Sequence, residues 1–299
     1  MSPAARAWQR FRDHRFGLAG LIVLTLLTTA CLSASWLAAA MGLDGDAVDL
    51  FGQFGPPSAT HPLGQDELGR DVLLRLLEGG QVSLSVAAVA ALAAATIGST
   101  IGLAAGYLGG WLDALLMRLV DSVIALPLLP LLIVLAAIDP AKLGLEPMGG
   151  NPDFGLARIV IIVALVGWTT PARLVRGATL AARAQGYVLA ARALGVAPVA
   201  VALRHILPNV SGPLIVATTL AMGQVILFES ALSFLGLGIQ PPTPSWGNML
   251  TGAQELIWQA PMLAVYPGLA IFLTVIAVNF LGDALQDALA PRASERAPL

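Results

Sequence analysis

Six apolar runs, each long enough to cross a lipid bilayer, constrain this 299-residue chain more than any other feature. A membrane-spanning helix needs about 20 mostly apolar residues, because its backbone polar groups find no water in the bilayer core. Only 11% of the residues are charged, whereas a soluble domain carries about 25%. The pattern predicts an all-α integral membrane protein with six transmembrane helices. The six runs are Gly17–Met41, Val82–Gly106, Leu112–Ile138, Leu156–Val175, Val210–Leu237 and Met262–Leu281.

The distribution of Lys and Arg predicts the orientation in the membrane, because cytoplasmic segments of membrane proteins are enriched in these residues. If the N-terminus is cytoplasmic, six crossings return the C-terminus to the cytoplasm, and the outer side holds only Arg70, Arg75, Lys142 and Arg158. The first run is too long for the apolar part of a cleaved signal peptide and is interpreted as a permanent anchor. We therefore expect both termini in the cytoplasm. The basic residues on that side are Arg6, Arg10, Arg12, Arg15, Arg118, Arg173, Arg176, Arg183, Arg192, Arg204, Arg292 and Arg296.

This topology leaves three outer loops, at residues 42–80, 139–155 and about 238–261. In the first loop, Leu68, Val72, Leu76 and Leu77 fall at helical spacing, and Asp71 can pair with Arg75 four residues later. The pattern predicts an amphipathic helix along the membrane surface that leads into the second span. A solvated loop helix without a partner is the alternative.

Small residues and prolines predict how two of the spans pack. Glycines at positions 98, 102, 106 and 110 are four residues apart and form a groove that another helix can approach closely. Pro127 and Pro130 predict a kink or break in the later half of the third span.

The sequence contains no recognisable motif for catalysis or metal binding. His14 and His205 belong to the inner side and His61 to the outer side, and Cys31 is the single cysteine. A phosphate-binding loop needs a Gly-Lys-Ser/Thr sequence, but the single lysine, Lys142, stands between Ala and Leu. We expect no catalytic residue, no metal and no cofactor bound by this chain, and no nucleic-acid partner.

Ionisable residues within spans are costly and often functional. Asp121 can pair with Arg118, three residues before it, which favours a structural role. Glu229 lies mid-span, so it either lines a translocation path or acts as a polar clamp between helices. Two other functions stay open at this point: a proton-driven secondary transporter that titrates Glu229, and an intramembrane hydrolase that uses Ser230 with Glu229. The candidate path residues are Asp121, Gln224, Glu229 and Ser230.

The segment Tyr187–Asn209 lies between the fourth and fifth spans, on the cytoplasmic side. It predicts a helix over about 185–194, a left-handed Gly195 followed by Pro198, and a second helix over 199–206 that stops before Pro208. Its surface is unusually apolar for a loop in water, so it either docks a partner or packs against the chain's own helix ends. The apolar positions are Leu189, Ala190, Ala193, Leu194, Val196 and Ala197.

The same segment resembles the coupling loop of ABC importer permeases, in which Ala-Ala, Gly and a Leu-Pro ending recur at fixed spacing. Further stretches, including "HPLGQDELGRDVL", "RHILPN" and "LSFLGLGIQPPTPSWG", resemble the dipeptide/oligopeptide/nickel importer subfamily, and specifically its second permease subunit. The resemblance covers about residues 6–292. It implies a type I importer permease fold with an N-terminal segment, 1–80, a five-helix core, 81–287, that contains the coupling loop at 179–209, and a tail, 288–299.

The resemblance also implies the partners and the site residues. The partners are a sister permease, two ATPase subunits that bind ATP and Mg, a periplasmic or lipid-anchored binding protein, and the lipid of the bacterial inner membrane. The substrate is expected to be a di- or oligopeptide or a related compound. The coupling residues are Tyr187, Leu189, Ala190, Ala191, Arg192, Ala193, Leu194, Gly195, Val196, His205, Leu207 and Pro208. The outer residues that receive the binding protein are Asp66, Glu67, Arg70, Pro241, Pro242 and Trp246.

One position departs from the family's pattern. Leu189 stands where the family has Glu, so the chain lacks an acid that would interact with the helix dipole by about 0.3–1 kcal/mol. Leu adds apolar area that contributes about 1–2 kcal/mol if docking buries it. We expect docking to survive and to depend more on apolar contact.

Overall fold

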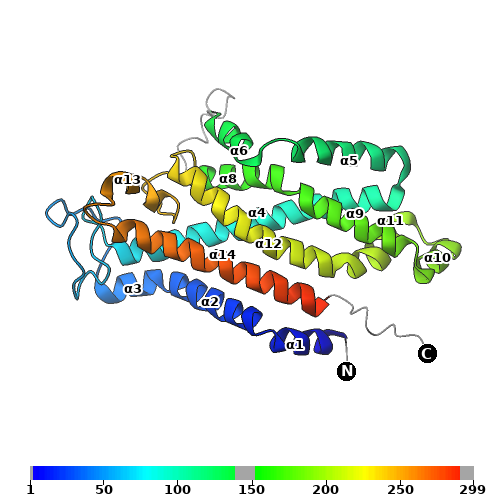
Figure 1. Ribbon diagram of the computed structural model, residues 1–299, viewed down its shortest axis with the longest axis horizontal. Helices are drawn as coiled ribbons and strands as arrows, with labels where there is room; N and C mark the ends of the chain where they lie inside the picture. Colours follow the sequence, from blue (N-terminus) through cyan, green and yellow to red (C-terminus); the bar gives the residue numbers. More distant parts are fainter. Residues whose placement is uncertain (1–2, 139–151, 290–299) are drawn as a thin grey trace.

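The computed structural model describes residues 3–138 and 152–289, and within these ranges it is built from helices without β-strands. Most of the helices run along the long axis of the molecule, with loops gathered at its two ends (Figure 1). We call the end that carries α10 (Gly186–Ala193) the α10 end. The opposite end carries residues 42–71 and 235–261 and is called the loop end. The all-α prediction is confirmed for the described residues.

Four helical segments of the described chain are long and apolar enough to cross a membrane alone. Two bent pairs of shorter helices raise the number to six if each pair is one span. Each of the six apolar runs therefore overlaps a helix that can span a bilayer or a helix of such a pair, although the first run also includes residues 33–41, beyond the first candidate span. The four segments are α2 (Arg15–Leu32), α4 (Val72–Leu108), the helical rod Pro198–Phe234 and α14 (Met262–Leu289).

The first bent pair contains the two prolines of the third apolar run. Helices α5 (Gly110–Ile124) and α6 (Leu128–Ala137) meet at an angle of 85°. Pro127 is the N-cap residue of α6, where its missing N–H group costs no helical hydrogen bond. The predicted break is confirmed. The second pair, α8 (Pro152–Gly167) and α9 (Thr169–Arg183), bends by 42° at Trp168, which the sequence did not predict.

Helix α4 begins earlier than predicted, and the separate surface helix is absent. Asp71 caps α4, because its Oδ1 accepts a hydrogen bond of 2.8 Å from the Leu74 N–H group. Its Oδ2 lies 2.9 Å from Nδ1 of His61, so it does not pair with Arg75 as expected. Arg75 instead donates to Asp46 over 3.1 Å. Val72, Leu76 and Leu77 of the predicted amphipathic helix therefore belong to the first turns of α4, which runs without interruption into the apolar span, whereas Leu68 precedes the helix.

Helix α4 packs closely against α9 through three of the four spaced glycines. Cβ atoms at positions 98, 102 and 106 would collide with the backbone or side chains of α9 and of Trp168 just before it. The expected groove is therefore filled by α9. Gly110 does not belong to it, because it starts α5 with a φ of 62° and has open space around it.

The remaining helices close the bundle. Helix α12 (Leu207–Phe234) packs against α4 and α14, and α2 packs against α14. Short helices α1 (Pro3–Asp13) and α3 (Ala34–Met41) flank α2, and α13 (Ala253–Leu256) with the 3₁₀ turn Asn248–Leu250 lies in the loop before α14. The buried apolar core lies between α4, α8, α12 and α14.

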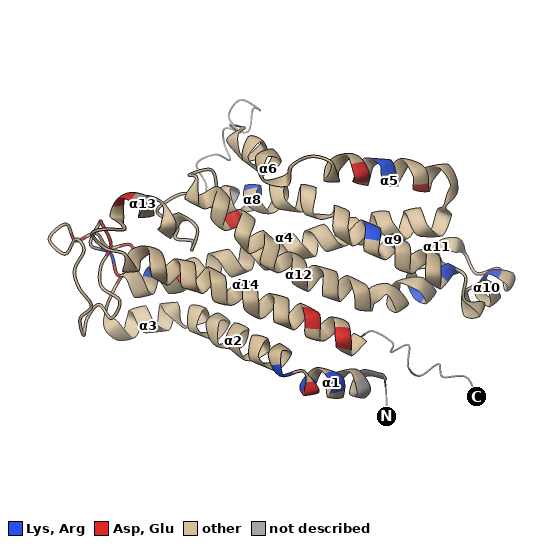
Figure 2. Cartoon of the chain, viewed as in Figure 1, with Lys and Arg blue, Asp and Glu red and all other residues tan. Residues whose placement is uncertain are grey.

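The two termini of the bundle lie at the same end. Helix α1 and the last turn of α14 are at the α10 end (Figure 1). Basic residues gather at this end, on α1, α9 and α10 (Figure 2). Most of the expected outer loop at 139–155 and the tail after residue 289 lie outside the described residues.

Candidate functional site

The segment between α9 and α12 forms the first helix and the turn that the sequence predicted. Helix α10 spans Gly186–Ala193, within one residue of the prediction at each end. Gly195 has a φ of 76°, the left-handed conformation that glycine adopts without strain. This turn ends α10 and allows α11 (Pro198–Val201) to start in a new direction.

The predicted stop before Pro208 is wrong, because the helix continues. Residues Ala202–Ile206 form a π-helical turn that joins α11 to α12 in one rod of 37 residues. In an α-helix the ring of Pro208 would clash with the carbonyl four residues earlier. The wider π turn avoids this clash, and the Asn209 side-chain amide donates to the His205 carbonyl over 2.7 Å.

The α10–α11 unit has an inner and an outer face. Val188 and Ala191 are 0% and 7% exposed and pack with apolar residues of α9 and of the rod. On the outer face, Leu189, Leu194 and Val199 are 52%, 84% and 68% exposed. One face thus packs against the chain itself, which is one of the two alternatives from the sequence. The other face is an apolar surface that the described residues leave uncovered.

Most of the expected coupling residues belong to the outer face. Ala191 does not, because helical spacing points it inward with Val188. Val196, His205 and Leu207 are half-buried at the edge of the unit. The exposed members of the set are Tyr187, Leu189, Ala190, Arg192, Ala193, Leu194, Gly195 and Pro208.

A cavity of about 600 Å³ lies between α12 and the two bent pairs of helices. Its walls come from both bent pairs, from one residue of α4 and from α12. Gln224 of α12, one of the candidate path residues, is on the wall. Asp121 of α5 is not on the wall. It accepts a hydrogen bond of 2.5 Å from Arg173 of α9, and Arg173 does line the cavity. The expected pair between Asp121 and Arg118 does not form in the described structure, because α9 presents Arg173 directly to Asp121.

A second ion pair also joins α5 to α9. Asp113 accepts two hydrogen bonds from Arg176, the longer of 2.7 Å, in the bidentate geometry typical of strong Arg–carboxylate pairs. The two pairs hold α5 against α9, although α5 and α6 are sharply bent.

Glu229 is enclosed between helices and does not line the cavity. Its side chain is 0% exposed, and it accepts hydrogen bonds from Ser83 of α4 over 3.1 Å and from Ser233 over 2.8 Å. Ser230, expected beside it on the path, is 7% exposed and also outside the cavity wall. Of the two roles open for Glu229, this geometry favours the polar clamp, and neither Glu229 nor Ser230 lines this cavity.

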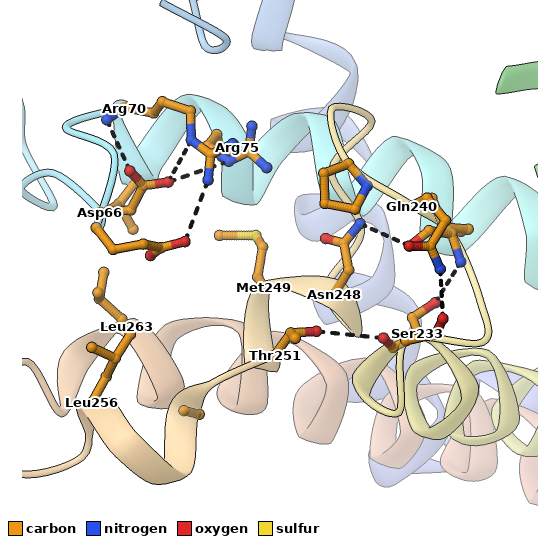
Figure 3. Close-up of a pocket in the computed structure, with 16 residues that line it drawn as sticks. Asp66, Arg70, Arg75, Ser233, Gln240, Asn248, Met249, Thr251, Leu256 and Leu263 are labelled. Atoms are coloured by element: carbon orange, nitrogen blue, oxygen red, sulfur yellow. Dashed lines mark hydrogen bonds and ion pairs between the residues drawn. The ribbon is translucent and has the colours of Figure 1, made fainter. Parts of the chain in front are cut away.

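At the loop end, a smaller pocket of about 300 Å³ is lined by charged and amide side chains together with apolar ones (Figure 3). Asp66 is its organising residue: Oδ1 accepts from the Leu68 and Arg70 N–H groups, and Oδ2 accepts from Arg70 Nε over 2.8 Å. Arg75 approaches the same carboxylate at 3.7 Å. These side chains satisfy one another, so the pocket is a folded support for the outer loop.

Some of the residues expected to contact a binding protein are buried at the loop end, and others are exposed. Asp66 and Trp246 are 7% and 1% exposed, so the structure corrects their assignment as direct contacts. Trp246 is held inside by hydrogen bonds to Ser83 and to the Leu76 carbonyl. Arg70 is largely covered by its acidic partners. Glu67, Pro241 and Pro242 remain at the surface.

Two features of these sites were missed by the sequence reasoning. Arg173 was assigned only to the inner side, although it lies on the cavity wall. Ser233 was overlooked as a partner of Glu229, although a spacing of four residues along a helix was a usable signal.

Comparison with known proteins identifies the family. The sequence profile of the "Binding-protein-dependent transport system inner membrane component" family matches residues 98–295. The profile of the "N-terminal TM domain of oligopeptide transport permease C" matches residues 2–57. The glutathione transport system permease protein GsiD of Shigella flexneri serotype 5b (strain 8401) is 39% identical over 294 residues, which cover 97% of this chain and 91% of that protein. The protein of the same name from Escherichia coli O6:K15:H31 (strain 536 / UPEC) is 40% identical over the same shares of both chains.

These matches cover nearly the whole chain and agree with its all-helical bundle, and the family is one of transport permeases and not of enzymes. They give no support to the proton-driven or hydrolase alternatives. The chain belongs to the family of binding-protein-dependent transport system inner membrane components, and it is a permease subunit of an ABC importer.

Proposed function

We propose that this chain forms half of the translocation path of an importer for peptide-like solutes in the bacterial inner membrane, and that α10 couples it to ATPase subunits. The observation that carries the proposal is the uncovered apolar face of the α10–α11 unit, which continues without a break into the rod Pro198–Phe234. The rod also forms part of the cavity wall. A push on the unit is therefore transmitted to the cavity by a continuous helix.

The partners follow from the family and from the two ends of the bundle. ATP and Mg would bind to two ATPase subunits at the α10 end, which we place in the cytoplasm together with both termini. A sister permease would complete the path. A periplasmic or lipid-anchored binding protein would deliver the solute to the loop end, where Glu67, Pro241 and Pro242 are exposed.

Support for a peptide-like solute comes from two sources. Relatives that match 97% of the chain are named as glutathione transport permeases. The cavity of about 600 Å³ is within the range of about 300–1,000 Å³ typical of small-molecule sites.

Co-purification tests the coupling role. Leu194 is the most exposed large apolar residue of the unit, at 84%, so Leu194→Asp places a charge at the centre of the proposed interface. We expect the chain to recover an ATPase and a second permease from its native membrane, and the variant to lose the ATPase but keep the second permease. Leu50→Asp, at a 63% exposed position of the loop end, is the matched control and should keep both. Equal recovery of the ATPase with Leu194→Asp would refute docking at this surface.

Uptake tests the substrate. Cells lacking this chain are supplied with it on a plasmid, and uptake of radiolabelled glutathione is measured with and without depletion of ATP. We expect uptake that requires both the chain and ATP. ATP-independent uptake by the purified chain alone would refute the importer assignment, and absent uptake would refute a glutathione-like substrate.

A further inference from the structure

The cavity wall is apolar except for a small group of polar side chains. Arg173 is the only charged residue on the described wall, and it is accompanied by Gln224, Thr169 and Thr170. Arg173 and Gln224 come from helices α9 and α12, on different walls of the cavity. A guanidinium and an amide in an otherwise apolar cavity are the elements of a site that recognises a polar solute.

The Gln224 amide has no hydrogen-bond partner within the described part of the chain, and its side chain is exposed to the cavity. It lies in the middle of a helix that is long enough to cross the membrane. Polar side chains at such depth normally face the bundle interior and bind a partner, because lipid offers none. The amide is therefore available to donate and accept hydrogen bonds with a molecule that enters the cavity.

Arg173 has a partner, but the partner is accessible. It donates to Asp121 over 2.5 Å, and the two side chains are 50% and 61% exposed. This exposure distinguishes the pair from Arg176 and Asp113, whose side chains are 34% and 17% exposed. Arg173 lies on the cavity wall, and its ion pair with Asp121 is not buried. Such an exposed pair can exchange one carboxylate for another at small cost, because exposed ion pairs contribute little net free energy.

We propose that Arg173 binds the C-terminal carboxylate of a peptide-like solute in exchange for Asp121, and that the Gln224 amide hydrogen-bonds a peptide group of the same solute. This assignment rests on the proposed function, and it specifies the chemistry that the solute must carry. Asp121 now occupies the acceptor position at Arg173 that the solute carboxylate would take.

The chemistry of the groups supports this exchange. A guanidinium presents a planar fork of donors that matches a carboxylate, and hydrogen bonds between charged groups are about twice as strong as neutral ones. In glutathione the other α-carboxylate is adjacent to an ammonium group, which neutralises it locally. The glycine carboxylate has no such neighbour and is the better partner for Arg173. The positive charge of Arg173 is balanced by Asp121 before the solute binds and by the solute carboxylate afterwards.

The test compares two probes in the assembled transporter, reconstituted in vesicles with its binding protein. The probes are glutathione and its glycine C-terminal amide, and the measured quantity is the ratio of their kcat/KM values for ATP-dependent uptake. The binding protein contributes equally to this ratio in all variants. Arg173→Gln should lower the ratio about tenfold, the size expected for one charge-assisted hydrogen bond. The loss should fall on glutathione and not on the amide.

Three variants separate recognition from a merely structural ion pair. Arg118→Gln removes an equal charge from an exposed position of α5 that is not on the cavity wall, and it should keep the wild-type ratio. Arg173→Lys should restore part of the ratio. Asp121→Asn should lower KM for glutathione, because the competing carboxylate is gone.

The outcomes distinguish this inference from the proposed function. If Arg173→Gln and Asp121→Asn both reduce uptake of the two probes equally, the pair is structural and the inference is overturned. An unchanged ratio in Arg173→Gln also overturns it, while the proposed function stands. If the wild-type transporter does not take up glutathione, the substrate class and this assignment fall together.

Discussion

Glu229 is the residue at which the clamp and the proton-coupling hypotheses predict different results. Its carboxylate accepts from the hydroxyls of Ser83 and Ser233. Those hydroxyls in turn accept from the backbone N–H groups of Trp246 and Ile239, over 3.2 and 3.1 Å. The outer loop that follows α12 is thus tied to α4 and α12 through one buried carboxylate.

Replacing Glu229 by Gln keeps the shape and removes one acceptor. The new NH₂ group must donate where the carboxylate oxygen accepted, so one serine loses the acceptor for its O–H group. Loss of one hydrogen bond to a carboxylate, with a buried donor left unpaired, costs about 1–2 kcal/mol. At about 2–4 °C per kcal/mol, the midpoint of thermal unfolding should fall by about 2–8 °C. Glu229→Leu removes both acceptors and should cost about twice as much.

Thermal unfolding of the purified assembled transporter measures this effect, and uptake at a temperature below the transition measures function. Ser83→Ala should produce a fall similar to that of Glu229→Gln. Ser85→Ala is the control, because the Ser85 hydroxyl only donates to the Val82 carbonyl of its own helix. Uptake by Glu229→Gln should stay within about threefold of wild type, since stability and not proton transfer is affected. An unchanged midpoint together with abolished uptake would refute the clamp and favour a titrating role.

Three further predictions follow from local geometry. Gly102→Ala should destabilise the transporter by about 1–3 kcal/mol in thermal unfolding, because its Cβ meets the backbone of α9. The control is Gly177→Ala, in open space on α9, which should leave the stability unchanged or raise it by up to about 1 kcal/mol. Asp71→Ala removes the N-cap of α4 and should cost about 1 kcal/mol, seen as faster proteolysis of residues 42–71; equal proteolysis would contradict the capping role. Leu189→Glu loses about 1–2 kcal/mol of apolar contact and gains about 0.3–1 kcal/mol from interaction with the helix dipole. Solute-stimulated ATPase activity should therefore change by less than about tenfold. Complete loss of this activity would show that the apolar contact dominates.

Short-range sequence patterns correctly predicted the structural elements that depend on neighbouring residues in the chain. The apolar runs lie in the helices that can cross the membrane, since burial in lipid demands length and apolarity from each segment by itself. The break at Pro127 and the left-handed Gly195 were predicted because each depends on one residue's backbone. The same reasoning failed at Pro208, because the π turn that accommodates it involves a change of hydrogen bonding over several preceding residues.

The sequence by itself determined the class of protein, the number of apolar runs and the segment that forms α10, since these depend on composition and on spacing along one helix. Only the tertiary structure decided which polar groups meet. Asp121 is 52 residues from Arg173, Ser83 is 146 residues from Glu229, and Trp246 is 163 residues from Ser83. Such pairs form because the packing of α4, α5, α9 and α12 brings their faces together, and one helix's pattern carries no information about the face that its neighbour presents.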